Sequence, residues 1–206
     1  MILDLDRLRE CPLARDPFDF VVVENFIRAD YVPSLLADFP APPSHGSFPL
    51  LPEMRGGAFG RLAEELESGA LRGALEDKFG VELSGRPTMI TLRGWSDGKD
   101  GRIHTDSATK IITLLLYMNP VWEPRAGRLR LLRSPDDLED CAAEVAPLAG
   151  NMVAFRRSET SFHGHYPHVG ERCSIQLNWV TDAAVVRREL GRHRWSARLK
   201  ALNPFG

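Results

Sequence analysis

The spacing of hydrophobic positions changes near residue 87. Before this point, apolar residues recur at helical intervals over Ala58–Phe79, with a break at Ser68-Gly69 and an expected end at Gly80. A shorter helix is predicted over Asp30–Phe39, with Asp30 as its N-cap. After residue 87, short runs of apolar and β-branched residues predict seven strands: Thr88–Gly94, Arg102–Asp106, Lys110–Met118, Arg128–Leu132, Met152–Phe155, Ser161–Pro167 and Arg172–Thr181.

Turn-rich segments separate these strands, which is typical of an antiparallel sandwich or barrel. Lys110–Met118 is apolar at both alternating positions, so it is expected to be a central strand covered on both faces. A further strand is predicted over Asp19–Phe26, and Ser134–Pro147 is expected to be partly helical. The predicted fold class is therefore mainly β with flanking α-helices.

The chain is expected to form one domain, 1–206, because no internal repeat or second domain is visible. Helical support is expected over 28–80, the β core over about 87–181 and a basic C-terminal helix over 185–202. The segment 40–57 is rich in Pro and Gly and reads as a loop, with a lid as one open role. The basic C-terminal segment is expected to be exposed to solvent, where its positive charge balances the net negative charge of the rest of the chain.

Composition and charge exclude several classes of protein. The 206 residues are 43% hydrophobic and 26% charged, with a formal net charge of −2, which is ordinary for a soluble protein and argues against a nucleic-acid or membrane partner. Three widely spaced cysteines fit a reducing compartment. No signal peptide or membrane span is visible, so a cytoplasmic location is expected, and the oligomeric state stays open.

Histidines and one aspartate form the first candidate site. Side chains two apart in a strand share a face, so His104 and Asp106 are expected to project together, roughly 7 Å apart at their Cα atoms. Alone, such a pair more often makes a hydrogen bond than a metal site. Two histidines and one carboxylate form the facial triad of non-haem Fe(II) oxygenases, so a third ligand would change that reading. His163 is the candidate, and His165 and His168 lie close enough in sequence to compete with it.

A polar strip follows the histidines. The segment 168–171 reads as a tight turn, after which Arg172, Ser174, Gln176 and Asn178 alternate with apolar residues. Such a strip can simply face solvent, but here it begins beside the candidate metal ligands. Arg172 offers a guanidinium that can hold a carboxylate through two parallel hydrogen bonds.

An ordered set of segments resembles a known family: IHTDS, ITLLLYMN, AGRLRLL, PLAGNMVAF, SFHGHYPHVGER and SIQLNWV. Together they are similar to the 2-oxoglutarate- and Fe(II)-dependent dioxygenases of the prolyl 4-hydroxylase-like superfamily. The similarity covers about Met89 to Thr181. It implies a double-stranded β-helix, a cupin-like jelly roll, supported by the N-terminal helices.

The resemblance also implies roles for particular residues. His104, Asp106 and His163 would bind Fe(II), and Arg172, assisted by Ser174, would bind the distal carboxylate of 2-oxoglutarate. Many members carry a tyrosine on the strand before the His-x-Asp motif, where this sequence offers Trp95 and Arg102. Arg102 would contact the cosubstrate or the substrate, or else form a salt bridge with Asp97 or Asp100.

The implied reaction is hydroxylation of an unactivated C–H bond with O2 and 2-oxoglutarate, releasing succinate and CO2, with ascorbate as a candidate reductant. The carboxylate of Asp106 favours hydroxylation over halogenation, because related halogenases lack it. A small molecule and a peptide are both open as substrates. Two alternatives remain: a non-catalytic jelly-roll binding or regulatory protein, and a cupin-type metalloenzyme that does not use 2-oxoglutarate.

Overall fold

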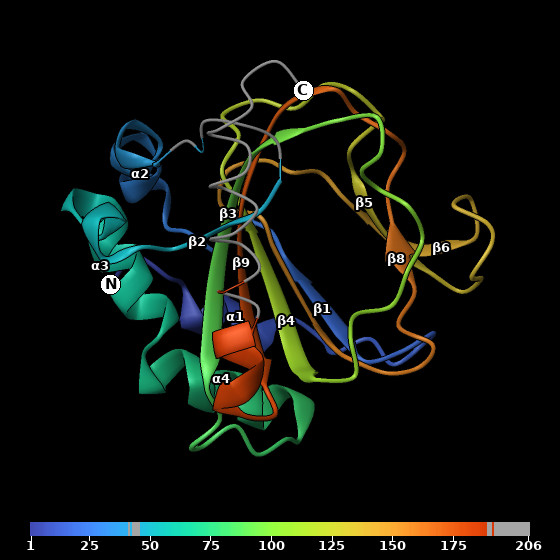
Figure 1. Ribbon diagram of the computed structural model, residues 1–206, viewed down its shortest axis with the longest axis horizontal. Helices are drawn as coiled ribbons and strands as arrows, with labels where there is room; N and C mark the ends of the chain where they lie inside the picture. Colours follow the sequence, from blue (N-terminus) through green and yellow to red (C-terminus); the bar gives the residue numbers. More distant parts are fainter. Residues whose placement is uncertain (41, 43–45, 189–190, 192–206) are drawn as a thin grey trace.

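The computed structural model describes residues 1–40, 42, 46–188 and 191, and two antiparallel sheets dominate it (Figure 1). The larger sheet has six strands in the order β1-β7-β4-β9-β3-β2. The smaller sheet has three, in the order β6-β5-β8. The strands are β1 Phe20–Val23, β2 Phe48–Pro49, β3 Thr88–Ser96, β4 Lys110–Tyr117, β5 Leu129–Leu132, β6 Cys141–Val145, β7 Met152–Arg156, β8 His163–Gly164 and β9 Gly170–Val180.

Helices cover one face of the larger sheet, and the smaller sheet lies against the other (Figure 1). The α-helices are α1 Leu5–Glu10, α2 Val32–Asp38, α3 Gly57–Leu66 and α4 Gly69–Phe79, with 3-10 turns η1 Ala29–Tyr31 and η2 Pro52–Met54. Together with the two facing sheets, this arrangement is the double-stranded β-helix architecture that the sequence predicts.

The break between α3 and α4 follows the sequence prediction. Ser68 caps α4 by accepting a hydrogen bond from the Leu71 amide, and Gly80 ends the helix with a left-handed φ of 62°. The predicted cap of the shorter helix is wrong, because Asp30 lies in η1 and α2 begins after Tyr31 without a side-chain cap. α1 was not predicted.

Strand β4 is central, as its apolar pattern predicts. It pairs with β7 on one side and β9 on the other. Its Leu114 and Leu116 pack toward the helices in a core that also contains Trp179, whereas Tyr117 belongs to the core between the sheets. Every second residue of β4 therefore faces the space in which the candidate site lies.

Three sequence predictions need correction. Residues 102–106 do not form a strand, since His104 makes only an isolated antiparallel bridge to His163. The strand predicted over 161–167 shortens to β8. The segment 134–147 contains strand β6 rather than a helical turn, because Cys141–Val145 pairs with β5. The predicted helix 185–202 falls mostly outside the described residues. In this part of the chain, the described residues 183–188 and 191 are helical.

Candidate metal centre and cosubstrate pocket

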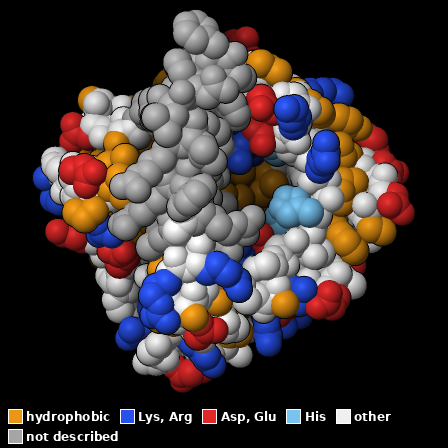
Figure 2. Space-filling model, in the orientation of Figure 1, with side chains coloured by type: hydrophobic (Ala, Val, Ile, Leu, Met, Phe, Trp, Pro, Cys, Tyr) orange, Lys and Arg blue, Asp and Glu red, His pale blue; other side chains and the backbone are white. Residues whose placement is uncertain are grey.

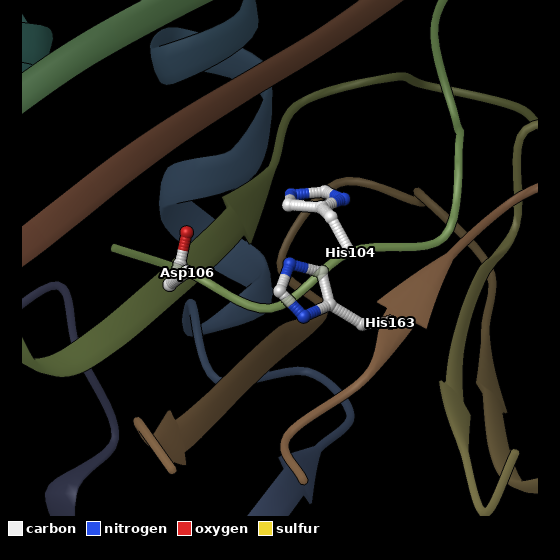
Figure 3. A group of neighbouring side chains, drawn as sticks. All are labelled: His104, Asp106 and His163. Atoms are coloured by element: carbon white, nitrogen blue, oxygen red, sulfur yellow. The ribbon is translucent and has the colours of Figure 1, made fainter. Parts of the chain in front are cut away.

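The bridge between His104 and His163 brings two distant segments of the chain together. Each backbone amide donates to the other residue's carbonyl, at 3.0 and 2.9 Å. The two rings consequently lie with centroids 4.3 Å apart, and the Asp106 side chain projects beside them (Figure 3). One ligand atom from each of the three residues lies within 4.8 Å of the others. The structure therefore gathers two imidazoles and one carboxylate at one place.

Backbone carbonyls orient both imidazoles. His104 Nδ1 lies 2.8 Å from the Arg102 carbonyl oxygen, and His163 Nδ1 lies 3.0 Å from that of Ser161. Because a carbonyl only accepts hydrogen bonds, each Nδ1 carries the proton and each Nε2 keeps its lone pair. This is the usual arrangement of metal-binding histidines. The donor set and its orientation fit a non-haem Fe(II) site.

Asp106 is held in its ionised form. Burial raises the pKa of its carboxyl, but the Lys110 ammonium, the nearby His163 and the Thr113 hydroxyl together hold that pKa below its usual range. Lys110 Nζ lies 2.7 Å from Oδ1, and Thr113 Oγ1 donates to Oδ2 at 2.5 Å. The carboxylate is therefore fixed in position and charged near neutral pH.

Replacement of Thr113 by valine tests the orientation of this carboxylate. The change keeps the shape of the side chain and removes the hydrogen bond to Oδ2. We expect metal affinity to fall about tenfold, as is common when a partner of a metal ligand is lost. Titration with Fe(II) under anaerobic conditions measures it, and Thr88→Val on the same sheet is the matched control. Unchanged affinity in Thr113→Val would show that Lys110 alone orients Asp106.

The neighbouring histidines lie outside this cluster. His165 lines the adjoining cavity, and its Nδ1 lies 2.9 Å from the Tyr166 carbonyl oxygen. His168 packs against Trp122, with ring centroids 4.6 Å apart. Of the three histidines that the sequence offered as the third ligand, His163 is the one that the fold places beside His104 and Asp106.

Stability of the metal-free protein is expected to fall below pH 6.5. Burial lowers the pKa of both His163 and His165 to about 4, against an ordinary value of 6.5. Between these values the unfolded chain binds protons that the folded chain does not, so lower pH favours unfolding. The cost is about 1.4 kcal/mol per pH unit for each histidine.

Urea unfolding at pH 7, 6 and 5 measures this effect. The loss per pH unit is expected to be smaller in His165→Gln, which removes one of the two buried imidazoles. If wild-type stability were flat across this range, the two imidazoles would not be buried as neutral groups.

A cavity of about 360 Å³ extends from the histidine cluster to Arg172 and Ser174 on β9. It opens on the face shown in Figure 2, where a hollow is bordered by basic side chains and a histidine. Arg172, Ser174 and Gln176 line it, as expected from strand alternation, while Cys173, Ile175 and Leu177 point to the other face. The polar strip of the sequence thus faces the cavity and not bulk solvent.

Arg172 is buried, with 6% of its surface exposed, and its orientation is fixed. Its Nε donates to the Gly127 carbonyl at 2.8 Å, which leaves the two terminal nitrogens for a carboxylate. Its guanidinium carbon lies 5.4 Å from the centroid of the Tyr117 ring. Burial lowers the pKa of Arg172, but a guanidinium remains charged at any ordinary pH.

Tyr117 is the residue at this site that the sequence least clearly indicated. β4 places it opposite Ser174, on the same face as Thr113 and Leu115. Its buried hydroxyl lies beside the Arg172 guanidinium and donates no hydrogen bond within the described residues. A buried, unsatisfied donor beside Arg172 fits a site that receives a carboxylate.

The strand before the His-x-Asp motif presents a different residue from those expected. Trp95 is 43% exposed and does not line the cavity, whereas Arg93, opposite Ser174 in the register, does. Arg93 is paired with Asp100 at 2.6 Å. Arg102 lines the same cavity and forms no ion pair with the described residues, so the predicted salt bridge of Arg102 to Asp97 or Asp100 is absent there.

Comparison with known proteins agrees with this geometry. Residues 90–180 match the family model described as the 2OG-Fe(II) oxygenase superfamily. No curated protein sequence matches the chain. No helix in the described part of the chain is long and apolar enough to cross a membrane.

Several solved structures share the fold. A prolyl 4-hydroxylase from Pseudomonas putida is 21% identical, with a TM-score of 0.60 over 86% of this chain and 97% of that one. HygX from Streptomyces hygroscopicus, solved with nickel and 2-oxoglutarate bound, is 13% identical, with a TM-score of 0.54 over 80% of this chain and 82% of that one. A prolyl hydroxylase from Trichoplax adhaerens, in complex with a peptide fragment of hypoxia inducible factor, is 15% identical, with a TM-score of 0.57 over 85% of this chain and 86% of that one.

The family match lies on the segment that carries the histidine cluster and Arg172, and over this segment the chain is similar to 2-oxoglutarate-dependent Fe(II) oxygenases. The solved structures, two of which are prolyl hydroxylases, share the fold of this chain.

Proposed function

We propose that this enzyme hydroxylates an unactivated C–H bond of a small-molecule or peptidyl substrate, with O2 as oxidant and with release of succinate and CO2. The observation that carries the proposal is the convergence of His104, Asp106 and His163 within 4.8 Å at one end of a cavity whose other end holds Arg172. We also propose that residues 1–206 act as one catalytic domain.

Each residue has a defined role in this proposal. His104, Asp106 and His163 would hold Fe(II) through two imidazole nitrogens and one carboxylate. Arg172 binds the distal carboxylate of 2-oxoglutarate, with Ser174 and the Tyr117 hydroxyl as further donors. Fe(II) and 2-oxoglutarate together supply the oxidising chemistry when they are bound. Arg102 lines the same cavity as Arg172 and binds either the cosubstrate or the substrate through its positive charge.

The surrounding residues orient the metal ligands and exclude water from one wall of the cavity. Thr113 and Lys110 fix the Asp106 carboxylate, and the Arg102 and Ser161 carbonyls keep each imidazole Nε2 unprotonated. Leu115 and Leu129 line the cavity on its apolar side and exclude water from that wall.

The family match favours this proposal over the two alternatives that the sequence left open. A binding or regulatory protein with no catalysis does not require both a metal-binding triad and an anchored arginine. A metalloenzyme without 2-oxoglutarate would leave Arg172 and the unsatisfied Tyr117 hydroxyl unexplained.

A pair of alanine variants tests the ligand assignment. His163→Ala is expected to lose Fe(II) binding and all 2-oxoglutarate turnover, because a ligand is removed. His165→Ala is expected to keep Fe(II) binding, because its imidazole lies outside the cluster. Anaerobic Fe(II) titration and assay of succinate measure both. If His165→Ala lost the metal and His163→Ala retained it, His165 would be the third ligand.

A further inference from the structure

A second cavity adjoins the first at His104 and Asp106. It has a volume of about 300 Å³ and shares six lining residues with the first cavity: Ser47, Thr91, His104, Asp106, Lys110 and Gln176. The first cavity reaches Arg172, and the second reaches Asn178 and Val185. The proposed iron ligands His104 and Asp106 therefore stand between two compartments.

The cosubstrate cannot fill both compartments. Arg172 and Asn178 lie on the same face of β9, six residues apart, which corresponds to about 20 Å along a strand. A 2-oxoglutarate held at Arg172 and at the metal occupies the first compartment. The second compartment, beside Asn178, is left for the substrate.

The first cavity carries an excess of positive charge, whereas the charged side chains that line the second are Lys110 and Asp106. Among the described residues, the first cavity is lined by five cationic side chains, Arg93, Lys99, Arg102, Lys110 and Arg172, against the two carboxylates of Asp100 and Asp106. A divalent metal and a 2-oxoglutarate dianion cancel each other, so the formal excess of three positive charges persists in the loaded site. Because the whole chain carries −2, this excess is local to the cavity and attracts anions.

Lys110 is the cation that both compartments share. Its side chain is 16% exposed, and Nζ donates one hydrogen bond to Asp106. An ammonium has three N–H donors, so two remain for a further acceptor. Arg102 and Lys99 stand exposed on the first cavity, and their side chains form no ion pair with the described residues.

The second compartment offers further hydrogen-bond donors. Ser107 and Thr109 line it together with Asn178, whose side chain is buried. The amide Nδ2 of Asn178 has no hydrogen-bond partner within the described residues. A buried donor of this kind carries an energetic cost unless a ligand satisfies it. Among the described residues, neither cavity is lined by Phe, Tyr or Trp.

We propose that the substrate carries an anionic group, a carboxylate or a phosphate, which binds at Lys110 and Asn178 in the second compartment. Arg102 and Lys99, which line the first cavity alone, attract anions toward the metal centre that the two compartments share. The inference rests on the proposed function, because it takes the first compartment as the 2-oxoglutarate site. It assigns Arg102 to the substrate and not to the cosubstrate.

Calorimetric titration of inorganic phosphate, and separately of acetate, into the protein loaded with Zn(II) and saturating 2-oxoglutarate tests this site. At least one anion is expected to bind without displacing 2-oxoglutarate. Its affinity is expected to fall at least fivefold in Lys110→Met and in Arg102→Gln. Arg61→Gln, an exposed position on α3 away from both cavities, is the matched control and is expected to leave anion affinity unchanged.

The possible outcomes separate this inference from the proposed function. If 2-oxoglutarate binds but neither anion does, or if anion affinity is equal in all variants, the substrate site is wrong and the oxygenase assignment stands. If the anion and 2-oxoglutarate compete, the anion occupies the Arg172 site and the inference is overturned. If 2-oxoglutarate itself does not bind, the proposed function fails.

A substrate screen gives the second readout. Each carboxylic acid is paired with its methyl ester, and each phosphorylated compound with its unphosphorylated form. Succinate formation above the background is expected for charged members only. Turnover of neutral members, such as an uncharged prolyl peptide, at equal rates would overturn the inference.

Discussion

Asp106→Ala is expected to abolish turnover and to weaken Fe(II) binding by more than about 100-fold. Removal of the metal ligand itself is expected to weaken metal binding by more than the 10- to 100-fold that is typical when only a hydrogen-bond partner of a ligand is removed. The same change deprives Lys110, whose side chain is 16% exposed, of its ion-pair partner. The variant thus loses the negative charge that balances both the metal and the ammonium.

Anaerobic titration with Fe(II) and succinate assay measure the effect on Asp106→Ala. Asp77→Ala, an exposed position on α4, is the matched control and should behave as the wild type. Circular dichroism separates loss of metal from loss of fold. A folded Asp106→Ala protein with wild-type Fe(II) affinity would remove Asp106 from the ligand set.

Arg172→Ala is expected to impair 2-oxoglutarate binding while much of the metal affinity remains. Removal of one partner from a buried, hydrogen-bonded charge pair costs about 2–5 kcal/mol, equivalent to roughly 30- to 5,000-fold in affinity. The metal ligands come from other segments, so the Fe(II) titration should change little. The dissociation constant of 2-oxoglutarate, measured anaerobically with Fe(II) bound, checks the prediction.

Arg172→Lys separates charge from geometry. Lysine keeps the positive charge but loses the planar fork and the Nε bond to Gly127, so an intermediate affinity for 2-oxoglutarate is expected. Wild-type affinity in Arg172→Ala would place the cosubstrate carboxylate elsewhere, with Arg93 as the next cation in the cavity.

The regular elements could be predicted from the sequence because their signals are local. Helix α4 has a capping serine and a terminal glycine, and strand β4 has an unbroken apolar run. The segment 134–147 was mispredicted because its acidic turns resemble a helix start, while β6 depends on pairing with β5, which is a long-range contact. The short β8 likewise depends on its partner strand.

Residues of the candidate site could be predicted where their position depends on the alternation of side chains along a strand. The alternation along β9 put Arg172 and Ser174 on one face, and the structure places both in the cavity. His104 and Asp106 converge for a different reason from the expected strand, since an isolated bridge to His163 positions His104, and Lys110 and Thr113 hold Asp106. The roles of Arg93, Lys110 and Tyr117 depend on which strands are neighbours, and no local pattern reveals that.

The most direct test of the central claim begins with metal-free protein, to which Fe(II) and 2-oxoglutarate are added without oxygen. A weak visible absorption band of the iron–2-oxoglutarate chelate is expected, and admission of oxygen should bleach it as succinate forms. If no band appeared although Fe(II) binding was confirmed separately, the pocket at Arg172 would not hold 2-oxoglutarate, and the proposed chemistry would be wrong.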